Sequence, residues 1–253
     1  MTPVIIDRLR QLEAASRPLE PNAEERDGMS RAVLAHVESL LEWLDTAPGY
    51  CPDPGSEAAL DAAPIGSNPL GLARALDLLS RHVDRTSQNT TAAGFMAYIP
   101  VGSLYPAALG EFIGAVSNRF SGSAIGSAAA VRIENQVLRW LADAVGYPAA
   151  SGGNFLSGGS MANLSAIVVA REAAGLRPRE FERAVVYRTE QAHHCVAKGL
   201  RVAGMDECVQ RMIPVDARFR MDVKRLSDVM TEDSAAGLKP WLVIGTAGTT
   251  DTG

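Results

Sequence analysis

The residues with the clearest chemical potential form a turn of small residues ahead of an apolar helix, in the stretch "NFLSGGSMANLSAIVVAR" (154–171). A turn made of Gly158, Gly159 and Ser160 lets the backbone approach a ligand closely, and the helix after it offers free N–H groups and the positive end of its dipole. This pattern predicts a phosphate-binding site. Serine is also a favoured N-cap residue, so an ordinary helix start is the alternative interpretation.

A second group of reactive side chains is the run His193, His194 and Cys195, which directly follows a predicted strand. The histidines can be plain loop or helix-start residues. A zinc site is a weak alternative, because neighbouring side chains point in different directions and no second cluster stands at a metal-ligand spacing. A Cys195 nucleophile beside His194 is also weak, because adjacency in sequence is not the geometry that activates a thiol.

Hydroxyl groups form a third group after the last apolar run, where Thr246, Thr249 and Thr250 lie in "WLVIGTAGTTDTG" (241–253). Threonines at the end of a strand are candidates for ligand contacts. Their alternative is turn chemistry, in which the hydroxyls bond to the local backbone.

The elements that must position these three groups alternate between strands and helices after about residue 150. Such alternation predicts an α/β fold with a mainly parallel sheet flanked by helices. Ligands bind at the carboxyl ends of the strands in such sheets, so all three groups can lie on one rim. The predicted strands are 184–189, 208–215 and one from 241, and the predicted helices are 161–175, 193–204 and 222–237.

The first part of the chain has a helical pattern instead. Residues 1–28 are predicted to be an irregular or partly helical arm, and 47–69, rich in Pro, Gly and Ser, a linker. Residues 92–106 are expected to form an ordered loop. Helices are predicted over 30–46, with Ser30 as its cap, and over 70–84, 107–120 and 131–146. We therefore expect an N-terminal helical arm and linker over 1–90 and a second domain from residue 91.

Composition excludes several classes of function. Of the 253 residues, 47% are hydrophobic and 21% are charged, as in a globular protein with a sizeable core. A net charge of −5 argues against nucleic-acid or anionic-membrane partners. No apolar run reaches the roughly 18 residues of a membrane span, and no signal peptide is evident. Cys51, Cys195 and Cys208 are irregularly spaced, which indicates a reducing, cytoplasmic location rather than a disulfide framework.

Taken together and in this order, the motifs resemble the group II pyridoxal-phosphate-dependent decarboxylases, which include the aromatic amino acid, histidine, glutamate and diaminobutyrate decarboxylases. The resemblance covers about residue 30 to the C-terminus. It implies the fold-type I, aminotransferase-like fold of pyridoxal-phosphate-dependent transferases, and a homodimer. The stretches that carry it are "FMAYIPVGSLYPAALGEFIGAV", "IENQVLRWLADAVGYP", "SGGSMANLSAIVVAR", "EQAHHCVAKGLRVAG" and "WLVIGTAGTTDTG".

The resemblance also implies roles for single residues. Gly159 and Ser160 would hold the phosphate of pyridoxal 5'-phosphate. His193 would stack on the pyridine ring as a catalytic residue, and Thr246 would lie below or beside the ring. The substrate side would be lined by Tyr98, Ile99 and Pro100. Residues near Phe120 would reach across a dimer interface into the neighbouring site.

Several departures from the family pattern limit what the resemblance implies. Ile99 and Val101 replace positions that are often aromatic and hydroxylated, and Gly122 stands where a bulky aromatic residue is common, which argues against a dopa-like substrate. The family's Schiff-base lysine and its acid for the pyridinium nitrogen both follow the last strand seen here. Lys198, Lys224 and Lys239 do not lie in the matching context.

We therefore expect an incomplete, N-terminal part of a decarboxylase that converts an L-amino acid to an amine and CO₂, inactive by itself. The open alternatives are a non-catalytic partner subunit, a related lyase or aldehyde-forming enzyme on the same fold, and a plain phosphate-binding α/β protein.

Overall fold

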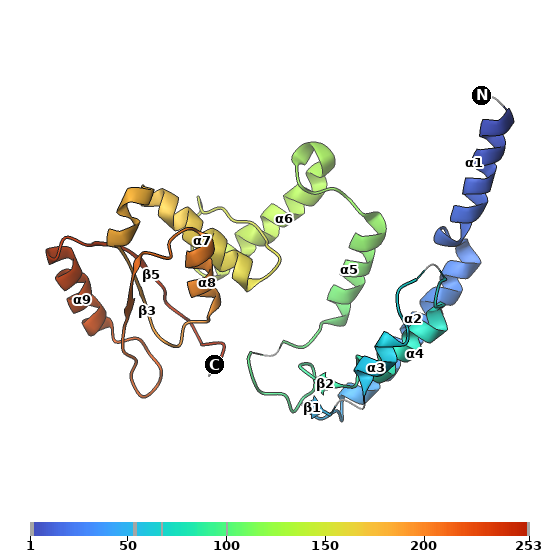
Figure 1. The fold of residues 1–253 in the computed structure, drawn as a ribbon, viewed down its shortest axis with the longest axis horizontal. Coiled ribbons are helices and arrows are strands. Elements are labelled where there is room, and N and C mark those ends of the chain that lie inside the picture. The colour runs from blue at the N-terminus through green and yellow to red at the C-terminus, as the bar shows by residue number, and fades with distance from the viewer. Residues whose placement is uncertain (1–2, 53–54, 67, 100, 252–253) are drawn as a thin grey trace. The chain divides into compact units, whose positions relative to one another are not determined.

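The structure of this protein is a computed structural model that describes residues 3–52, 55–66, 68–99 and 101–251. The chain divides into two compact units, Met1–Ser103 and Leu104–Gly253, and most of their elements are labelled in Figure 1. The expected functional division at residue 90 is a different boundary and stays a prediction. Among the described residues, no helix is both long and apolar enough to cross a membrane.

The first unit consists of helices and one short antiparallel ribbon (Figure 1). The predicted linker over 47–69 contains a strand and a helix instead of being structureless. Strand β1 pairs with β2, which follows α4 in the chain. Helix α3 contacts the last residue of α4, because Nδ1 of His82 lies 3.3 Å from Oγ of Ser56. The elements are α1 (Pro3–Ser16), η1 (Arg17–Leu19), α2 (Ala23–Leu44), β1 (Tyr50–Cys51), α3 (Ser56–Asp61), α4 (Leu72–His82) and β2 (Ser87–Gln88).

Helix α2 begins earlier than its apolar spacing predicts. The side chain of Asn22 accepts the N–H of Glu25 at 3.0 Å, and the Glu25 carboxylate accepts the N–H of Asn22 at 2.6 Å, so the two form a capping box. Ser30, expected as the cap, lies inside the helix and donates to the carbonyl of Arg26. The prediction for this helix start was wrong because both asparagine and serine cap helices, and the polar first two turns carry no apolar periodicity.

The second unit combines five α-helices, one 3₁₀ helix and a parallel sheet within the described residues. Helix α6 begins at Ser123, whose side chain accepts the N–H of Gly126, and it bends at Ser127, where φ is −160° and ψ is 83°. Its last residue is Ala144 and its C-cap is Val145, so Gly146, with φ at +78°, lies one residue beyond the cap instead of being the predicted cap. The elements are α5 (Tyr105–Ser117), α6 (Ala124–Ala144), α7 (Gly159–Ala173), η2 (Pro178–Arg183), β3 (Ala184–Arg188), α8 (Cys195–Val202), β4 (Val209–Met212), α9 (Val223–Ala235) and β5 (Lys239–Val243).

The sheet has the order β4-β3-β5, and both pairs of strands are parallel. Alternate residues of the buried central strand face two separate cores. Val186 packs with Ile167 of α7 and Leu200 of α8, whereas Val185 packs with Val229 of α9. Burying such a side chain stabilises the fold by about 1.5–3 kcal/mol. Helices therefore cover both faces, and the predicted α/β class with a mainly parallel sheet and an N-terminal helical arm is confirmed.

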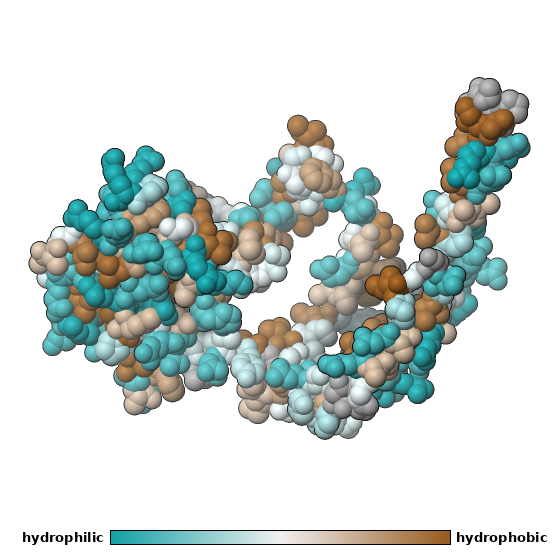
Figure 2. Space-filling model, viewed as in Figure 1, coloured by the Kyte–Doolittle hydropathy of each residue, from teal (hydrophilic) through white to brown (hydrophobic). Residues whose placement is uncertain are grey.

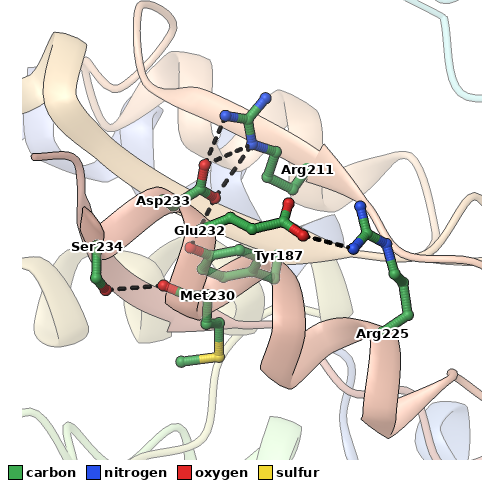
Figure 3. Close-up of polar contacts among 7 residues, drawn as sticks. All are labelled: Tyr187, Arg211, Arg225, Met230, Glu232, Asp233 and Ser234. Carbon is green, nitrogen blue, oxygen red and sulfur yellow. Dashed lines mark hydrogen bonds and ion pairs between the residues drawn. The ribbon is translucent and has the colours of Figure 1, made fainter. Parts of the chain in front are cut away.

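A polar network crosses the core on the α9 side of the sheet. Asp233 of α9 accepts hydrogen bonds from the hydroxyl of Tyr187 on β3 and from the guanidinium of Arg211 on β4 (Figure 3). The network joins α9 to two strands with directed contacts, in addition to the apolar packing around Val229.

Candidate functional site

The turn before α7 has the backbone conformation that its glycines predict. Gly158 is the N-cap of α7, with φ at +149° and ψ at 171°, a region that residues with a side chain rarely adopt. The alternative of an ordinary serine cap was wrong, because Ser160 lies within the first turn of the helix. A glycine at the N-cap has no side chain to accept the first N–H groups.

The backbone donors of this turn remain available. The N–H of Ala162 bonds to the carbonyl of Gly158 at 3.0 Å. Within the described parts of the chain, the N–H groups of Gly159, Ser160 and Met161 have no hydrogen-bond partner. A Cβ built on Gly158 or Gly159 meets no described atom within 4 Å, so no described part of the chain covers that side of the turn.

His193 lies between the end of β3 and the start of α8. Its Nδ1 accepts the backbone N–H of Cys195 at 3.2 Å, so the neutral ring carries its proton on Nε2. The ring is half buried, and its centroid lies 4.0 Å from that of the exposed His194. Backbone geometry thus fixes both the orientation and the tautomer of His193.

The structure adds no support to the metal and nucleophile alternatives for this segment. No group of three or more His, Cys, Asp or Glu side chains that could hold a metal ion is found in the part of the chain that the structure describes. Cys195 is buried in the apolar core in the same cluster as Ile167, away from solvent.

Helices α7 and α8 begin at the same end of the sheet. A Cβ on Gly199 of α8 would lie 3.6 Å from Cα of Leu164, near the start of α7. Further along both helices, the guanidinium of Arg171 donates to the carbonyl of Ala203 at 2.7 Å. The two helices therefore run in the same general direction, and both start at the carboxyl edge of β3, which α8 follows in the chain.

Thr246 reaches the same edge from the neighbouring strand. The N–H of Ile244, just past β5, donates to the carbonyl of Tyr187 on β3 at 2.8 Å, and exposed Thr246 follows two residues later. The structure thus brings Gly159, Ser160, His193 and Thr246 to one edge of the sheet. Their roles as cofactor ligands stay predictions.

The predicted substrate residues belong to the first unit. Tyr98 and Ile99 have φ values of +63° and +64°, and each is 56% exposed. Positive φ at two consecutive residues with side chains, one of them β-branched, is a strained backbone of the kind found at ligand-binding segments. Pro100 lies outside the described residues. The substrate roles of all three stay predictions.

The lysines of the described chain lie on its surface. Lys198, Lys224 and Lys239 are all exposed. Lys239 forms an ion pair with Glu180 at 3.2 Å. The pKa of the Glu180 carboxyl is lowered, first by the backbone N–H of Arg177 and then by Lys239.

Two side chains next to the glycine turn were missed by sequence reasoning. Asn163 donates from Nδ2 to the carbonyl of Gly159 at 2.8 Å. Arg139 of α6 donates to the carbonyls of Tyr147, Pro148 and Ala149, on the segment that leads to the turn. The contact of Asn163 could have been predicted, because asparagine has a low helix propensity and this one lies inside a predicted helix, four residues after Gly159. Arg139 carried no local signal.

Known proteins match this chain in sequence over most of its length. The sequence model of the pyridoxal-dependent decarboxylase conserved domain matches residues 77–253. The aromatic-L-amino-acid decarboxylase of Bacillus atrophaeus is 36% identical over 188 residues, which are 74% of this chain and 38% of that protein. The L-2,4-diaminobutyrate decarboxylase of Rhizobium meliloti (strain 1021) is 26% identical over 248 residues, 96% of this chain and 50% of that protein.

The structural comparison agrees with the sequence comparison. The crystal structure of Oryza sativa TDC with PLP and tryptamine matches with a TM-score of 0.81 and 26% identity, over 91% of this chain and 50% of that chain. This confirms the expected fold-type I architecture. The chain spans about half the length of the curated relatives it matches, or less. Because the conserved domain matches well over half of its residues, this chain belongs to the pyridoxal-dependent decarboxylase family.

Proposed function

We propose that this chain is the cofactor-binding part of a pyridoxal-phosphate-dependent decarboxylase that converts an L-amino acid to an amine and CO₂. The observation that carries the proposal is the glycine turn at the start of α7, at the edge of the sheet where His193 and Thr246 lie. Three of its backbone N–H groups have no hydrogen-bond partner among the described residues. Membership of the family supplies the chemical class.

The residues of the turn fit a phosphate group. A phosphate needs several N–H donors, a positive helix end and close approach of the backbone. Gly158 and Gly159 offer that approach because the position of a Cβ on either is empty. The hydroxyl of exposed Ser160 adds a further donor. We therefore assign Gly159 and Ser160 to the phosphate of pyridoxal phosphate.

The ring of His193 fits the face of a planar cofactor. Its Nδ1 is engaged by the backbone, so the ring cannot turn freely, and Nε2–H remains to donate a hydrogen bond to a substrate carboxylate. Thr246 would lie beside the cofactor ring. The chemistry that pyridoxal phosphate supplies when bound is uptake of the electron pair that departing CO₂ leaves behind. His193 orients the reacting groups and holds its proton at Nε2.

The lysine that binds the cofactor and the acid for its ring nitrogen are expected from residues beyond these 253. Lys198, Lys224 and Lys239 do not lie in the sequence context of the family's Schiff-base lysine, and Lys239 forms an ion pair with Glu180. The 253 residues alone are expected not to turn over. Tyr98, Ile99 and Pro100 would line the substrate side in the whole enzyme.

A homodimer is proposed from the apolar surface of α5 and α6. On α5, Leu109, Phe112, Ile113 and Val116 are between 46% and 72% exposed, and apolar residues are visible over both helices in Figure 2. A soluble protein rarely leaves so many large apolar side chains uncovered. Sedimentation of the full-length protein as a monomer at micromolar concentration would contradict the dimer.

The free thiols of Cys51, Cys195 and Cys208 support a reducing, cytoplasmic location.

The cofactor proposal is tested by three histidine variants of the full-length protein. His193→Ala should weaken binding of pyridoxal phosphate and abolish release of CO₂ and amine. His193→Phe, which keeps a flat ring without an N–H, should retain cofactor binding but lose most activity. His194→Ala is the matched control. The ring of His194 is exposed, so this variant should leave cofactor binding and activity unchanged.

Two results would overturn the proposal. The first is wild-type protein that binds pyridoxal phosphate no better than inorganic phosphate. The second is a His193→Ala variant that behaves like His194→Ala. Measuring aldehyde as well as amine in the same assay separates decarboxylation from the related aldehyde-forming chemistry.

A further inference from the structure

The side chain of Asn163, in the second turn of α7, bonds back to the first turn. Its Nδ2 donates to the carbonyl oxygen of Gly159 at 2.8 Å, and the residue is half buried. This carbonyl belongs to the same peptide unit as the N–H of Ser160. A peptide unit is planar and trans, so its C=O and N–H point in opposite directions. A hydrogen bond that holds the carbonyl therefore also sets the direction of the Ser160 N–H.

The first turn of α7 lacks the restraints that helix starts usually have. Gly158, at the N-cap, has no side chain to hold the N–H groups of the first turn. Gly159 adds a second residue with wide backbone freedom. In a helix that starts at Gly159, the backbone N–H of Asn163 also bonds to the Gly159 carbonyl, so Asn163 Nδ2 is a second donor that further limits the tilt of the peptide unit between Gly159 and Ser160. A ligand therefore has less to order on binding.

Asn163 is itself held in place by the packing of the next residue. The Cα of Leu164 lies 3.6 Å from the position of a Cβ on Gly199, so α7 and α8 are in close contact at that point. The backbone of Asn163 therefore starts from a rigid part of the helix, and its amide reaches into the less restrained first turn.

We propose that Asn163 is a positioning residue that aims the Ser160 N–H at the phosphate of the cofactor. The inference rests on the proposed function, because it needs a phosphate at this turn. It adds that affinity for the phosphate depends on a side chain that does not touch the ligand. The test is the dissociation constant for pyridoxal phosphate and for inorganic phosphate in the full-length protein, with the free energy of unfolding measured without ligand.

Four variants separate orientation from general stability. Asn163→Ala should weaken binding of both ligands about fivefold, as expected for one net hydrogen bond. Asn163→Ser should recover much of the loss, since a serine hydroxyl can donate to the carbonyl four residues earlier. Asn163→Asp has the same shape but no donor and a negative charge, so it should bind more weakly than Asn163→Ala. The control is Ser165→Ala, which removes a half-buried hydroxyl from the same helix and should leave binding unchanged.

The inference is overturned if Asn163→Ala binds both ligands within twofold of wild type, or if Asn163→Ser binds no better than Asn163→Ala. It is also overturned if the loss of binding merely follows a loss of unfolding free energy that Ser165→Ala shares. Failure of the proposed function looks different: wild-type protein would then show no preference for pyridoxal phosphate over inorganic phosphate, whatever residue stands at position 163.

Discussion

The hydroxyl of Tyr187 on β3 donates a 3.0 Å hydrogen bond to Oδ2 of Asp233 on α9, and both side chains are buried (Figure 3). Arg211 on β4 donates to the same carboxylate from Nη2 at 2.6 Å. Hydrogen bonding to Arg211 lowers the pKa of Asp233 in spite of its burial. Burial and then the Asp233 carboxylate raise the pKa of the Tyr187 hydroxyl. Three elements that are distant in sequence are thus joined at one buried charge.

Removing the hydroxyl of Tyr187 should destabilise the fold. Tyr187→Phe leaves one oxygen of the buried Asp233 with fewer donors, so the free energy of unfolding should fall by about 1–2 kcal/mol. Urea unfolding at neutral pH measures the change. Tyr147→Phe is the matched control, because Tyr147 is 64% exposed, and it should change stability by less than about 0.5 kcal/mol. Equal stability of the two variants would contradict a structural role for the hydroxyl.

The Arg211–Asp233 pair should make stability depend on acid pH. The pKa of Asp233 is lower in the folded protein than in the unfolded chain, so the pair stabilises the fold fully above the ordinary carboxyl pKa of 3.8. That contribution is lost as the pH falls further, through the lowered pKa of the folded state. Wild type should therefore lose more stability than Asp233→Asn between about pH 6 and about pH 3. Parallel pH profiles for the two proteins would show that the pair has no such effect.

Close packing of α7 and α8 should make Gly199 sensitive to a single methyl group. A Cβ on Gly199 would lie 3.0 Å from Cδ1 of the buried Ile167. Gly199→Ala should cost about 1–3 kcal/mol of unfolding free energy from overpacking, which outweighs the helix preference of alanine of about 1 kcal/mol.

A double-mutant cycle tests the cause of that cost. Ile167→Val removes Cδ1, so Gly199→Ala should cost less in this background, with a coupling of at least about 0.5 kcal/mol. Gly110→Ala on α5 is the control, because no atom lies within 4 Å of its Cβ position, and it should be neutral or stabilising. Additive effects of the two core substitutions would rule out the proposed clash.

The segment between α6 and the glycine turn should depend on Arg139. Its guanidinium donates to the carbonyls of Tyr147, Pro148 and Ala149 at 3.3, 3.1 and 3.0 Å, and Asp143 holds it at 2.7 Å. Arg139→Met removes all of these contacts, so a protease that cleaves after aromatic residues should cut after Phe155, which is followed by Leu156, several-fold faster.

Arg132 provides the control for that experiment. It lies two turns earlier on α6 and makes no hydrogen bond or ion pair with the described residues, so Arg132→Met should be cut at the wild-type rate. If both variants are cut equally fast, the segment does not depend on the Arg139 contacts.

Patterns among near neighbours were enough to predict much of the second unit. The apolar run of "AVVYRT" between polar segments predicted β3, and Asp222 caps α9 as its place before that helix indicates, by accepting the N–H of Arg225. The small residues at 158–160 predicted an open turn before α7. Each of these features depends on residues a few positions apart, so local propensity and spacing contain the needed information.

The tertiary structure decided the features that join distant residues. The cap of α2 at Asn22 rather than Ser30, the pairing of strand β1 in the predicted linker with β2, and the buried Tyr187–Asp233 contact all depend on a choice among several plausible partners. The sequence by itself determined the family, the parallel α/β unit and the candidate phosphate turn. Only the folded chain decided the tautomer of His193 and the contacts of Asn163 and Arg139, because a hydrogen bond requires a distance and an angle that residue order alone does not specify.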